Sequence, residues 1–339
     1  MAYIAGLDIG GTKLAVLLAK AEDGVVTPLA KRKFPTPKGG YPPARESMAS
    51  ALRELLHQAG DVELSSIGIS CGGPLDSAKG LILSPPNLPG WDEIPAAEDF
   101  AQAFGVPCRL QNDADACALA EWRFGAGRGC QSMVFLTFGT GFGAGLILDG
   151  KLYTGASSMA GEIGHCRCPQ ADGTPYAPVG SGKAGSFEGF CSGGGLAELG
   201  RAMALEAIQK GTPPAYCPSP EALGSVTALS MAQAAEAGDP VALAAYRCCG
   251  RHLGMALSLL MDLLNPERIV IGSVYARSEH LLREAALEVV QREALPGNRA
   301  ACQVVPAALG DSLGDAAALS VALAALGQGE GFTFAPAAL

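Results

Sequence analysis

Two stretches that lie far apart in the chain share one pattern, an apolar run, a turn rich in glycine and threonine, and a second apolar run. The first turn is Gly10-Gly11-Thr12 and the second is Gly139-Thr140-Gly141. Glycine adopts the positive φ angles that tight turns need, so each stretch predicts a β-hairpin. An internal repeat of this kind indicates two related domains, each offering a glycine turn to one ligand.

The chemistry of these turns suits an anion. A tight glycine turn leaves backbone N–H groups exposed, and such groups form anion-binding concavities. Thr12 adds a hydroxyl donor and Lys13 a positive charge, whereas the Asp8 carboxylate suits a phosphate only if a divalent cation lies between them. The alternative is a pair of ordinary hairpins whose polar residues face water, but two such turns favour phosphate binding.

The rest of the chain alternates strands and helices, which predicts α/β layers. We expect helices over residues 45–58, 114–124, 196–208, 230–237, 240–264, 279–292 and 314–326, and further strands over residues 29–34, 67–70, 106–110, 268–271 and 302–306. The tail after Gly327 is expected to be poorly ordered or packed on the surface.

Composition excludes several classes of protein. A chain of 339 residues can form two domains, and a net charge of −9 disfavours a nucleic-acid partner. Its longest apolar runs are interrupted by polar residues, so we expect no membrane partner. The 11 cysteines contain no C-x-x-C pair, and no secretory signal is visible, which predicts reduced thiols in a cytoplasm.

Three further features leave two interpretations open. Asp113 lies between a predicted strand and a predicted helix, where it would be either a helix N-cap or a carboxylate facing a ligand. Trp91 lies in a Pro/Gly-rich loop, as the wall of a ligand site or as a packing anchor. Glu162 and His165 form either a surface turn or a polar pair for a hydroxylated ligand.

Taken together, these motifs resemble the ROK family of bacterial sugar kinases and sugar-responsive repressors. The resemblance covers roughly residues 3–326 and depends on the order of the motifs. They are Asp8-x-Gly10-Gly11-Thr12-Lys13, Gly72-Gly73-Pro74, Asn87-Leu88-Pro89-Gly90-Trp91, Asn112-Asp113-Ala114, Gly139-Thr140-Gly141-x-Gly143, Gly161-Glu162-Ile163-Gly164-His165 and Ile271-Gly272.

The resemblance implies an actin-like ATPase (ribonuclease H-like) fold, with two α/β domains around a cleft. The smaller domain would comprise residues 1–113 and about 310–339, and the larger one residues 114–309. Asp113 would be the general base, and sugar-binding residues would be Gly73, Asn87, Asn112, Asp113, Glu162, His165 and Glu188. ATP would be bound by Asp8, Gly10, Gly11, Thr12, Lys13, Gly139, Thr140, Gly141 and Gly272, with Gly272 near the adenosine and Asp8 orienting Mg²⁺ directly or through water.

The activity that the resemblance implies is ATP-dependent phosphorylation of a free hexose at its 6-hydroxyl, with glucose as the default substrate. Fructose and N-acetylated hexosamines stay open as substrates, and the family also suggests a homodimer. One alternative is a sugar-responsive repressor, but the first hairpin begins within a few residues of Met1 and the charge is acidic. Another is a sugar-binding protein without transfer, which the retention of Asp113 and both turns argues against.

The chain departs from the family at one point. Many members carry a zinc site with the pattern C-x-C-G-x-x-G-C-x-E, and in this chain Val179, Ser181 and Ser186 occupy its three cysteine positions. Valine has no donor atom and serine is a poor zinc ligand, so we expect no structural zinc. Cys166 and Cys168, together with His165, could form a substitute site. Without zinc, we expect the Pro/Gly-rich segment 169–185 to be ordered by packing alone.

Overall fold

The structure is a computed structural model that describes residues 1–168, 174–327 and 331–335. Contacts between residues divide the chain into two units. Unit 1 comprises residues 1–130, 145–160 and 308–339, and unit 2 comprises residues 131–144 and 161–307. This division keeps residues 114–130 and 145–160 with the N-terminal unit, whereas the sequence prediction assigned both segments to the larger domain.

Unit 1 is built on a six-stranded sheet with the order β15-β3-β2-β1-β4-β7. The first three strands are an antiparallel meander, β1 (Ala2–Ile9), β2 (Lys13–Glu22) and β3 (Val25–Pro35). Strands β4 (Leu64–Cys71) and β7 (Cys108–Asn112) extend the sheet parallel to β1. The first predicted hairpin is therefore present, and its turn lies between β1 and β2.

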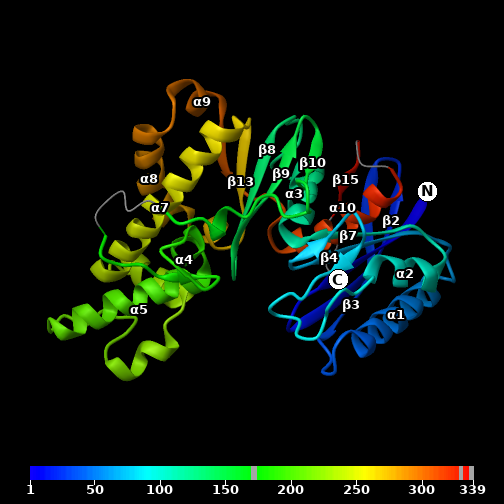
Figure 1. The fold of residues 1–339 in the computed structure, drawn as a ribbon, viewed down its shortest axis with the longest axis horizontal. Helices are drawn as coiled ribbons and strands as arrows, with labels where there is room; N and C mark the ends of the chain where they lie inside the picture. The colour runs from blue at the N-terminus through cyan, green and yellow to red at the C-terminus, as the bar shows by residue number, and fades with distance from the viewer. Residues whose placement is uncertain (169–173, 328–330, 336–339) are drawn as a thin grey trace. The chain divides into compact units, whose positions relative to one another are not determined.

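Helices cover both faces of this sheet (Figure 1). Helices α1 (Tyr41–Gln58) and α2 (Ala96–Phe104) contribute to one apolar core with alternate residues of β1 and β2. Helix α10 (Leu313–Ala325) packs on the opposite face, where Leu319 and Leu323 contact Ile4 and Val26, and α3 (Asp113–Phe124) packs against α10. Sequence analysis missed α2, which is a short helix between two loops.

Close packing of α10 on the sheet requires glycine in two strands. A Cβ atom added at Gly6 would lie 2.9 Å from the Cβ of Ala318. One added at Gly68 would lie 2.2 Å from the backbone nitrogen of Ala322. Real Cβ atoms do not approach backbone this closely, so the helix can reach the sheet only over glycine.

A buried carboxylate fixes the chain where it leaves and re-enters unit 1. Glu121 is fully buried at the end of α3, and its side chain accepts hydrogen bonds from the backbone N–H groups of Ala126, Ala308 and Leu309 at 2.7, 3.2 and 2.9 Å. Three donors satisfy a charge that would otherwise be costly to bury. Residues 187 positions apart in sequence are thereby tied to one side chain.

The second sheet has the order β10-β9-β8-β13-β14. Its strands are β8 (Met133–Phe138), β9 (Phe142–Leu148), β10 (Lys151–Tyr153), β13 (Arg268–Ile271) and β14 (Gln303–Pro306). The turn between β8 and β9 is the second predicted hairpin, and the boundary between the units passes through β9 after Ala144. Strand β13 is parallel to both β8 and β14.

Helices make up most of the rest of unit 2. They are α4 (Phe187–Cys191), α5 (Gly193–Gln209), α6 (Ala228–Glu236), α7 (Pro240–Leu264), α8 (Val274–Glu293) and α9 (Pro296–Ala301). Helix α8 begins five residues before its predicted start at residue 279. Short hairpins pair β11 (Val179–Gly180) with β12 (Lys183–Ala184) in this unit and β5 (Leu75–Asp76) with β6 (Leu81–Ile82) in unit 1.

The C-terminal tail differs from the prediction. Strand β15 (Thr333–Phe334) pairs in parallel with Val25 and Val26 of β3, and the Phe334 ring lies 5.7 Å from that of Phe124. This segment is therefore part of the sheet. The other tail residues for which a prediction was made, 328–330 and 336–339, lie outside the described residues.

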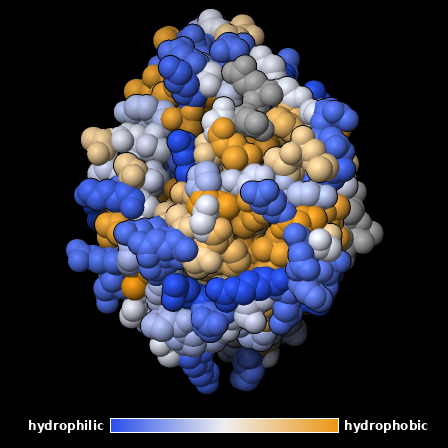
Figure 2. Space-filling model, turned by 90° about the vertical axis from the view of Figure 1, so that its right-hand side faces the viewer, coloured by the Kyte–Doolittle hydropathy of each residue, from blue (hydrophilic) through white to orange (hydrophobic). Residues whose placement is uncertain are grey.

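Figure 2 shows one side of the surface, where an apolar area is bordered by hydrophilic residues. None of the helices formed by the described residues combines the length and the hydropathy that crossing a bilayer requires.

The glycine contacts generate a stability prediction. Gly68→Ala should lower the free energy of unfolding by about 3 kcal/mol or more, because the new methyl group overlaps the α10 backbone. Gly297→Ala is the matched control, since a Cβ in that α9 position meets no atom within 4 Å. Urea unfolding of both variants is the measurement, and equal stabilities would contradict the packing argument.

Candidate active site

The predicted site residues of unit 1 gather at one edge of its sheet. Strands β1, β4 and β7 are parallel, and Ile9, Cys71 and Asn112 lie in register at their carboxyl ends. Asp8 directly precedes Ile9 on β1, and Asp113 directly follows Asn112, the last residue of β7. The carboxyl edge of parallel strands is where α/β proteins bind ligands, so this edge is the first candidate site.

The first glycine turn lies at the same edge and has no room for a side chain. The N–H of Gly10 donates to the carbonyl of Lys13 at 3.1 Å, and the Thr36 hydroxyl donates to the Gly10 carbonyl at 2.7 Å. A Cβ at Gly11 would lie 2.5 Å from the backbone oxygen of Asn87. The predicted sugar residue Asn87 therefore lies directly against the predicted phosphate turn.

Asn112 provides the cap of helix α3. Its side-chain oxygen accepts the N–H of Ala114 at 2.9 Å, and its Nδ2 lies 3.1 Å from the position that a Cβ of Gly73 would take. Gly73, Asn87 and Asn112, three predicted sugar residues, are thus neighbours of this edge. The next residue, Asp113, is the first residue of the helix.

Asp113 combines solvent access with an altered proton affinity. The side chain is exposed, and one of its oxygens accepts the N–H of Ala114 at 2.8 Å. Surrounding protein atoms remove part of its hydration, which raises the pKa of the Asp113 carboxyl above its ordinary value, although the hydrogen bond from Ala114 acts against that change. The N-cap residue of α3 is Asn112, and Asp113 shares the Ala114 N–H with it.

Asp8 is held in an unfavourable electrostatic environment. Burial, followed by the negative charges of Asp113 and Asp315, raises the pKa of Asp8 from 3.8 to about 6, against the opposing effect of Lys31 and Lys33. Lys31 is already paired with Asp315, at 2.6 and 2.8 Å to the two carboxylate oxygens. A cation next to Asp8 would relieve this repulsion.

This chemistry fits Mg²⁺ carried by a nucleotide. Magnesium keeps several waters and is usually bound by one or two carboxylates together with substrate phosphates. Within the described ranges, no three His, Cys, Asp or Glu side chains are arranged to hold a metal by themselves. Asp8 lies beside a glycine turn whose free space a side chain would fill, and it can supply the one carboxylate that a magnesium ion bound to phosphates needs.

The second glycine turn, in unit 2, is supported by elements that sequence analysis did not include. The N–H of Gly139 donates to the Gly141 carbonyl at 3.1 Å, and the N–H of Gly193, at the start of α5, donates to the Gly139 carbonyl at 2.8 Å. Ser273 lies 3.5 Å from the position that a Cβ of Gly139 would take. The run of three glycines at 193–195 after a capping serine is the signal that could have identified the α5 terminus.

Gly272 follows β13 at the end that carries this turn. Its N–H donates to the carbonyl of Leu136 at 2.9 Å, and a Cβ would lie 3.0 Å from the ring of Phe135. Because β13 is parallel to β8, the carboxyl ends of both strands bring Gly272 and the turn after β8 to one edge. The structure therefore places the predicted adenosine residue beside the predicted phosphate turn.

The predicted sugar residues of unit 2 also lie around this turn. Glu188 accepts the N–H of Phe142 at 3.1 Å, and its Oε2 lies 2.8 Å from the position that a Cβ of Gly141 would take. Gly164, in the 3₁₀ turn Ile163–His165, packs on the Phe142 carbonyl, where a Cβ would lie 1.7 Å from the oxygen. Glu162 and His165 are consequently carried close to Glu188 by a backbone contact that only glycine allows.

Comparisons with known proteins identify the family of this chain. The sequence matches the ROK family over residues 4–325, nearly the whole chain. The chain belongs to the ROK family. A glucokinase of Halalkalibacterium halodurans is 30% identical over 315 residues, 92% of each chain, and an N-acetylmannosamine kinase of Shigella boydii is 40% identical over 193 residues, 56% of this chain and 62% of that one.

Solved structures of ROK proteins have the same fold. One is a ROK glucokinase from Streptomyces griseus in complex with glucose and AMPPNP, with a TM-score of 0.72 and 28% identity. The comparison covers 95% of this chain and 99% of that one. The predicted membership of the ROK family is confirmed.

The residues at the ROK zinc positions do not fit a metal. Val179 has no donor atom, the Ser181 hydroxyl donates to Glu188 at 2.6 Å, and the Ser186 hydroxyl caps α4 by accepting the N–H of Gly189 at 3.2 Å. Of the residues proposed as a substitute site, Cys166 is exposed and Cys168 is buried. Their loop continues into residues 169–173, which lie outside the described residues.

Trp91 is a packing anchor. Its ring is buried and meets the ring of Tyr41 edge-on, with 5.0 Å between the centroids. The contact belongs to the core beneath α1, so this loop tryptophan stabilises unit 1.

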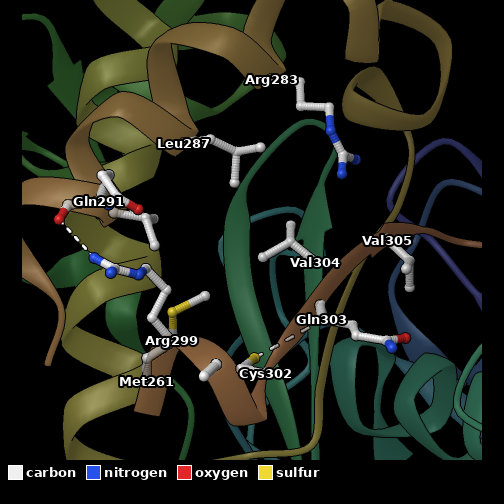
Figure 3. Close-up of a pocket in the computed structure, with 11 residues that line it drawn as sticks. Met261, Arg283, Leu287, Gln291, Arg299, Cys302, Gln303, Val304 and Val305 are labelled. Atoms are coloured by element: carbon white, nitrogen blue, oxygen red, sulfur yellow. Dashed lines mark hydrogen bonds between the residues drawn. The ribbon is translucent and has the colours of Figure 1, made fainter. Parts of the chain in front are cut away.

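A separate cavity of about 620 Å³ lies in unit 2 between α8, α9 and β14 (Figure 3). Its lining includes Met261, Leu287 and Val304, together with Arg283 and Arg299. Arg299 donates to the Gln291 carbonyl at 2.6 Å. No residue predicted for the active site lines this cavity.

The Asp8 environment predicts a pH-dependent gain of stability on mutation. The pKa of Asp8 is about 6 in the folded protein and 3.8 for an ordinary aspartate, so between these values the folded state binds a proton that the unfolded chain releases. Protonated Asp8 therefore contributes stability at low pH, and this contribution is lost as pH rises through about 6. Asp8→Asn should therefore raise the free energy of unfolding by about 1–3 kcal/mol near pH 7.5 and by little near pH 4.

Urea unfolding at both pH values measures this effect. Asp149→Asn, in the exposed turn between β9 and β10, is the matched control. A stability change of Asp8→Asn that is the same at both pH values would refute the electrostatic account of Asp8.

Proposed function

We propose that this protein transfers the γ-phosphoryl group of ATP to a hydroxyl of a free hexose, within an actin-like ATPase fold. The observation that carries the proposal is the position of Asp113, an exposed carboxylate at the carboxyl edge of three parallel strands, beside Asp8 and the first glycine turn. Relatives named as sugar kinases, at about 30% identity over most of the chain, support the reaction class.

Asp113 acts as the general base. A sugar hydroxyl is a weak nucleophile at neutral pH, and a carboxylate against it accepts the proton as the bond to phosphorus forms. The raised pKa of the Asp113 carboxyl makes its carboxylate a stronger proton acceptor, which favours proton transfer. The hydrogen bond from Ala114 fixes one carboxylate oxygen and leaves the other for the sugar.

The glycine turns bind the phosphates. Phosphoryl transfer depends mainly on in-line positioning and on neutralising charge, which bound Mg²⁺ supplies together with protein donors. The backbone of Gly10 and Gly11, with Thr12 and Lys13, offers donors at one turn, and Gly139-Thr140-Gly141 offers them at the other. Asp8 orients the cation, directly or through water, and Gly272 lies at the adenosine.

Sugar hydroxyls are bound by Asn87, Asn112, Glu162, His165 and Glu188, with Gly73 leaving room for the ring. Paired polar contacts discriminate strongly, because an analogue lacking a hydroxyl leaves a buried group unsatisfied. We propose glucose at its 6-hydroxyl as the default substrate, since the relatives matched over most of this chain include glucokinases. An N-acetylated hexosamine is the second candidate, because the relative with 40% identity is an N-acetylmannosamine kinase. A cytoplasmic location and a homodimer stay predictions.

The direct test is release of ADP from ATP and Mg²⁺ in the presence of a hexose panel that includes glucose, fructose, mannose, allose, N-acetylglucosamine and N-acetylmannosamine. We expect one hexose to stimulate release well above the rate without sugar. Binding of a sugar without ADP release would instead indicate a sugar-binding protein that has lost transfer, as in the regulatory alternative.

Asp113→Asn should keep the fold and lower kcat by at least ~10²-fold, because the variant cannot accept the proton. Steady-state kinetics with the preferred hexose give the effect, and circular dichroism checks the fold. Asp61→Asn, an exposed loop residue, serves as the control with unchanged kcat. Retention of most activity by Asp113→Asn would remove Asp113 from the mechanism.

Substitutions in the glycine turns should mainly weaken the binding of ATP. Gly139→Val places a branched side chain toward Ser273, and Thr12→Ala removes a hydroxyl donor. Both variants should raise KM for ATP by about tenfold or more while KM for the hexose changes little. The opposite pattern, a raised hexose KM with an unchanged ATP KM, would assign these turns to the sugar.

A further inference from the structure

The hairpin that replaces the ROK zinc segment makes a set of hydrogen bonds around Glu188. Strands β11 and β12 pair Val179 with Ala184 and Gly180 with Lys183, so a two-residue turn connects them. Both turn residues have positive φ, 47° at Ser181 and 72° at Gly182, as in the turns that favour tight hairpins. The described part of segment 169–185 therefore contains a hydrogen-bonded hairpin, whereas the expectation was that packing alone would order the segment.

Three polar side chains connect the hairpin to its surroundings. The Ser186 hydroxyl, which is fully buried, donates to the Gly180 carbonyl at 3.3 Å while capping α4. Lys183 donates from its Nζ to the His165 carbonyl at 2.8 Å. Ser181 donates to Oε1 of Glu188 at 2.6 Å.

The bonds to Glu188 link two parts of the proposed site. One carboxylate oxygen accepts the Ser181 hydroxyl, and the other accepts the N–H of Phe142 in the second glycine turn. The hairpin also packs on this side chain, because a Cβ at Gly180 would lie 2.7 Å from the Cβ of Glu188. The rotamer of Glu188 is therefore set from both sides.

We propose that hydrogen bonds from Ser181, Lys183 and Ser186 stabilise this hairpin in place of a zinc ion. We also propose that Ser181 is a positioning residue that orients Glu188 toward the sugar. The role of Glu188 in sugar binding rests on the proposed function, whereas the stabilisation of the hairpin rests on geometry alone. Hydroxyl and ammonium donors to carbonyl and carboxylate oxygens make the connections that thiolate–zinc bonds would otherwise make.

The structural half is tested by thermal unfolding with and without EDTA. We expect the melting temperature of the wild-type protein to be unchanged by the chelator. Ser186→Ala should lower it by about 2–5 °C, because the α4 cap and the bond to Gly180 are lost. A large fall of the wild-type melting temperature with EDTA, or an unchanged melting temperature of Ser186→Ala, would overturn this half.

The positioning role is tested with Ser181→Ala and the matched control Ser225→Ala, an exposed serine whose hydroxyl donates to the Ala222 carbonyl at 2.8 Å. Calorimetric titration with the preferred hexose, without nucleotide, should show about tenfold weaker binding for Ser181→Ala and wild-type binding for the control. KM for the hexose should rise similarly while KM for ATP stays within about twofold. Ser181→Asn, which tolerates positive φ and keeps a donor, should restore most of the affinity.

These measurements separate the inference from the proposed function. If the wild-type protein released no ADP with any hexose, the proposed function would be refuted. The unfolding experiment would still test whether these hydrogen bonds stabilise the hairpin. Sugar binding by Ser181→Ala equal to that of the wild type would refute the positioning role even in an active kinase.

Discussion

Contact between backbone segments, at distances that only glycine permits, holds together each part of the candidate site. Gly68 lets α10 lie on β4, and β4 carries the edge at which Asn112 and its neighbours meet. In unit 2, Gly164 brings the turn of Glu162 and His165 onto the Phe142 carbonyl. A methyl group at either position would displace the element that presents the polar side chains, so the positions of functional groups depend on glycines that have no functional atoms of their own.

Two carboxylates of unit 1, those of Glu121 and Asp8, lie in different electrostatic surroundings. Glu121 is buried but is satisfied by three backbone donors, and it fixes the chain at the boundary of the unit. Asp8 lies close to Asp113 and Asp315, and burial together with these two negative charges raises its pKa to about 6. A carboxylate kept in such surroundings costs stability, as functional residues commonly do. The contrast supports a structural role for Glu121 and a ligand-binding role for Asp8.

Much of the fold could be predicted from sequence because its signals are local. The two glycine turns and the apolar periodicity of residues 45–58 and 240–264 appear as expected in hairpins and in helices α1 and α7. Features that depend on distant partners could not be predicted. Gly193 and Ser273, which lie next to the second turn, are 54 and 134 residues beyond Gly139 in the chain. The role of Trp91 was likewise undecided until its contact with Tyr41 was known.

The hydroxyl groups of Ser181 and Ser186 have a consequence for the chemical resistance of the protein. Thiolates that bind zinc are attacked by peroxide and by soft metal ions, and loss of the ion then releases the loop that it held. Serine hydroxyls undergo neither reaction, so the support of Glu188 should persist under oxidative or heavy-metal stress that would dismantle a cysteine-ligated relative. Such reagents would act first at the exposed thiol of Cys166, which lies four residues after Glu162 in the chain.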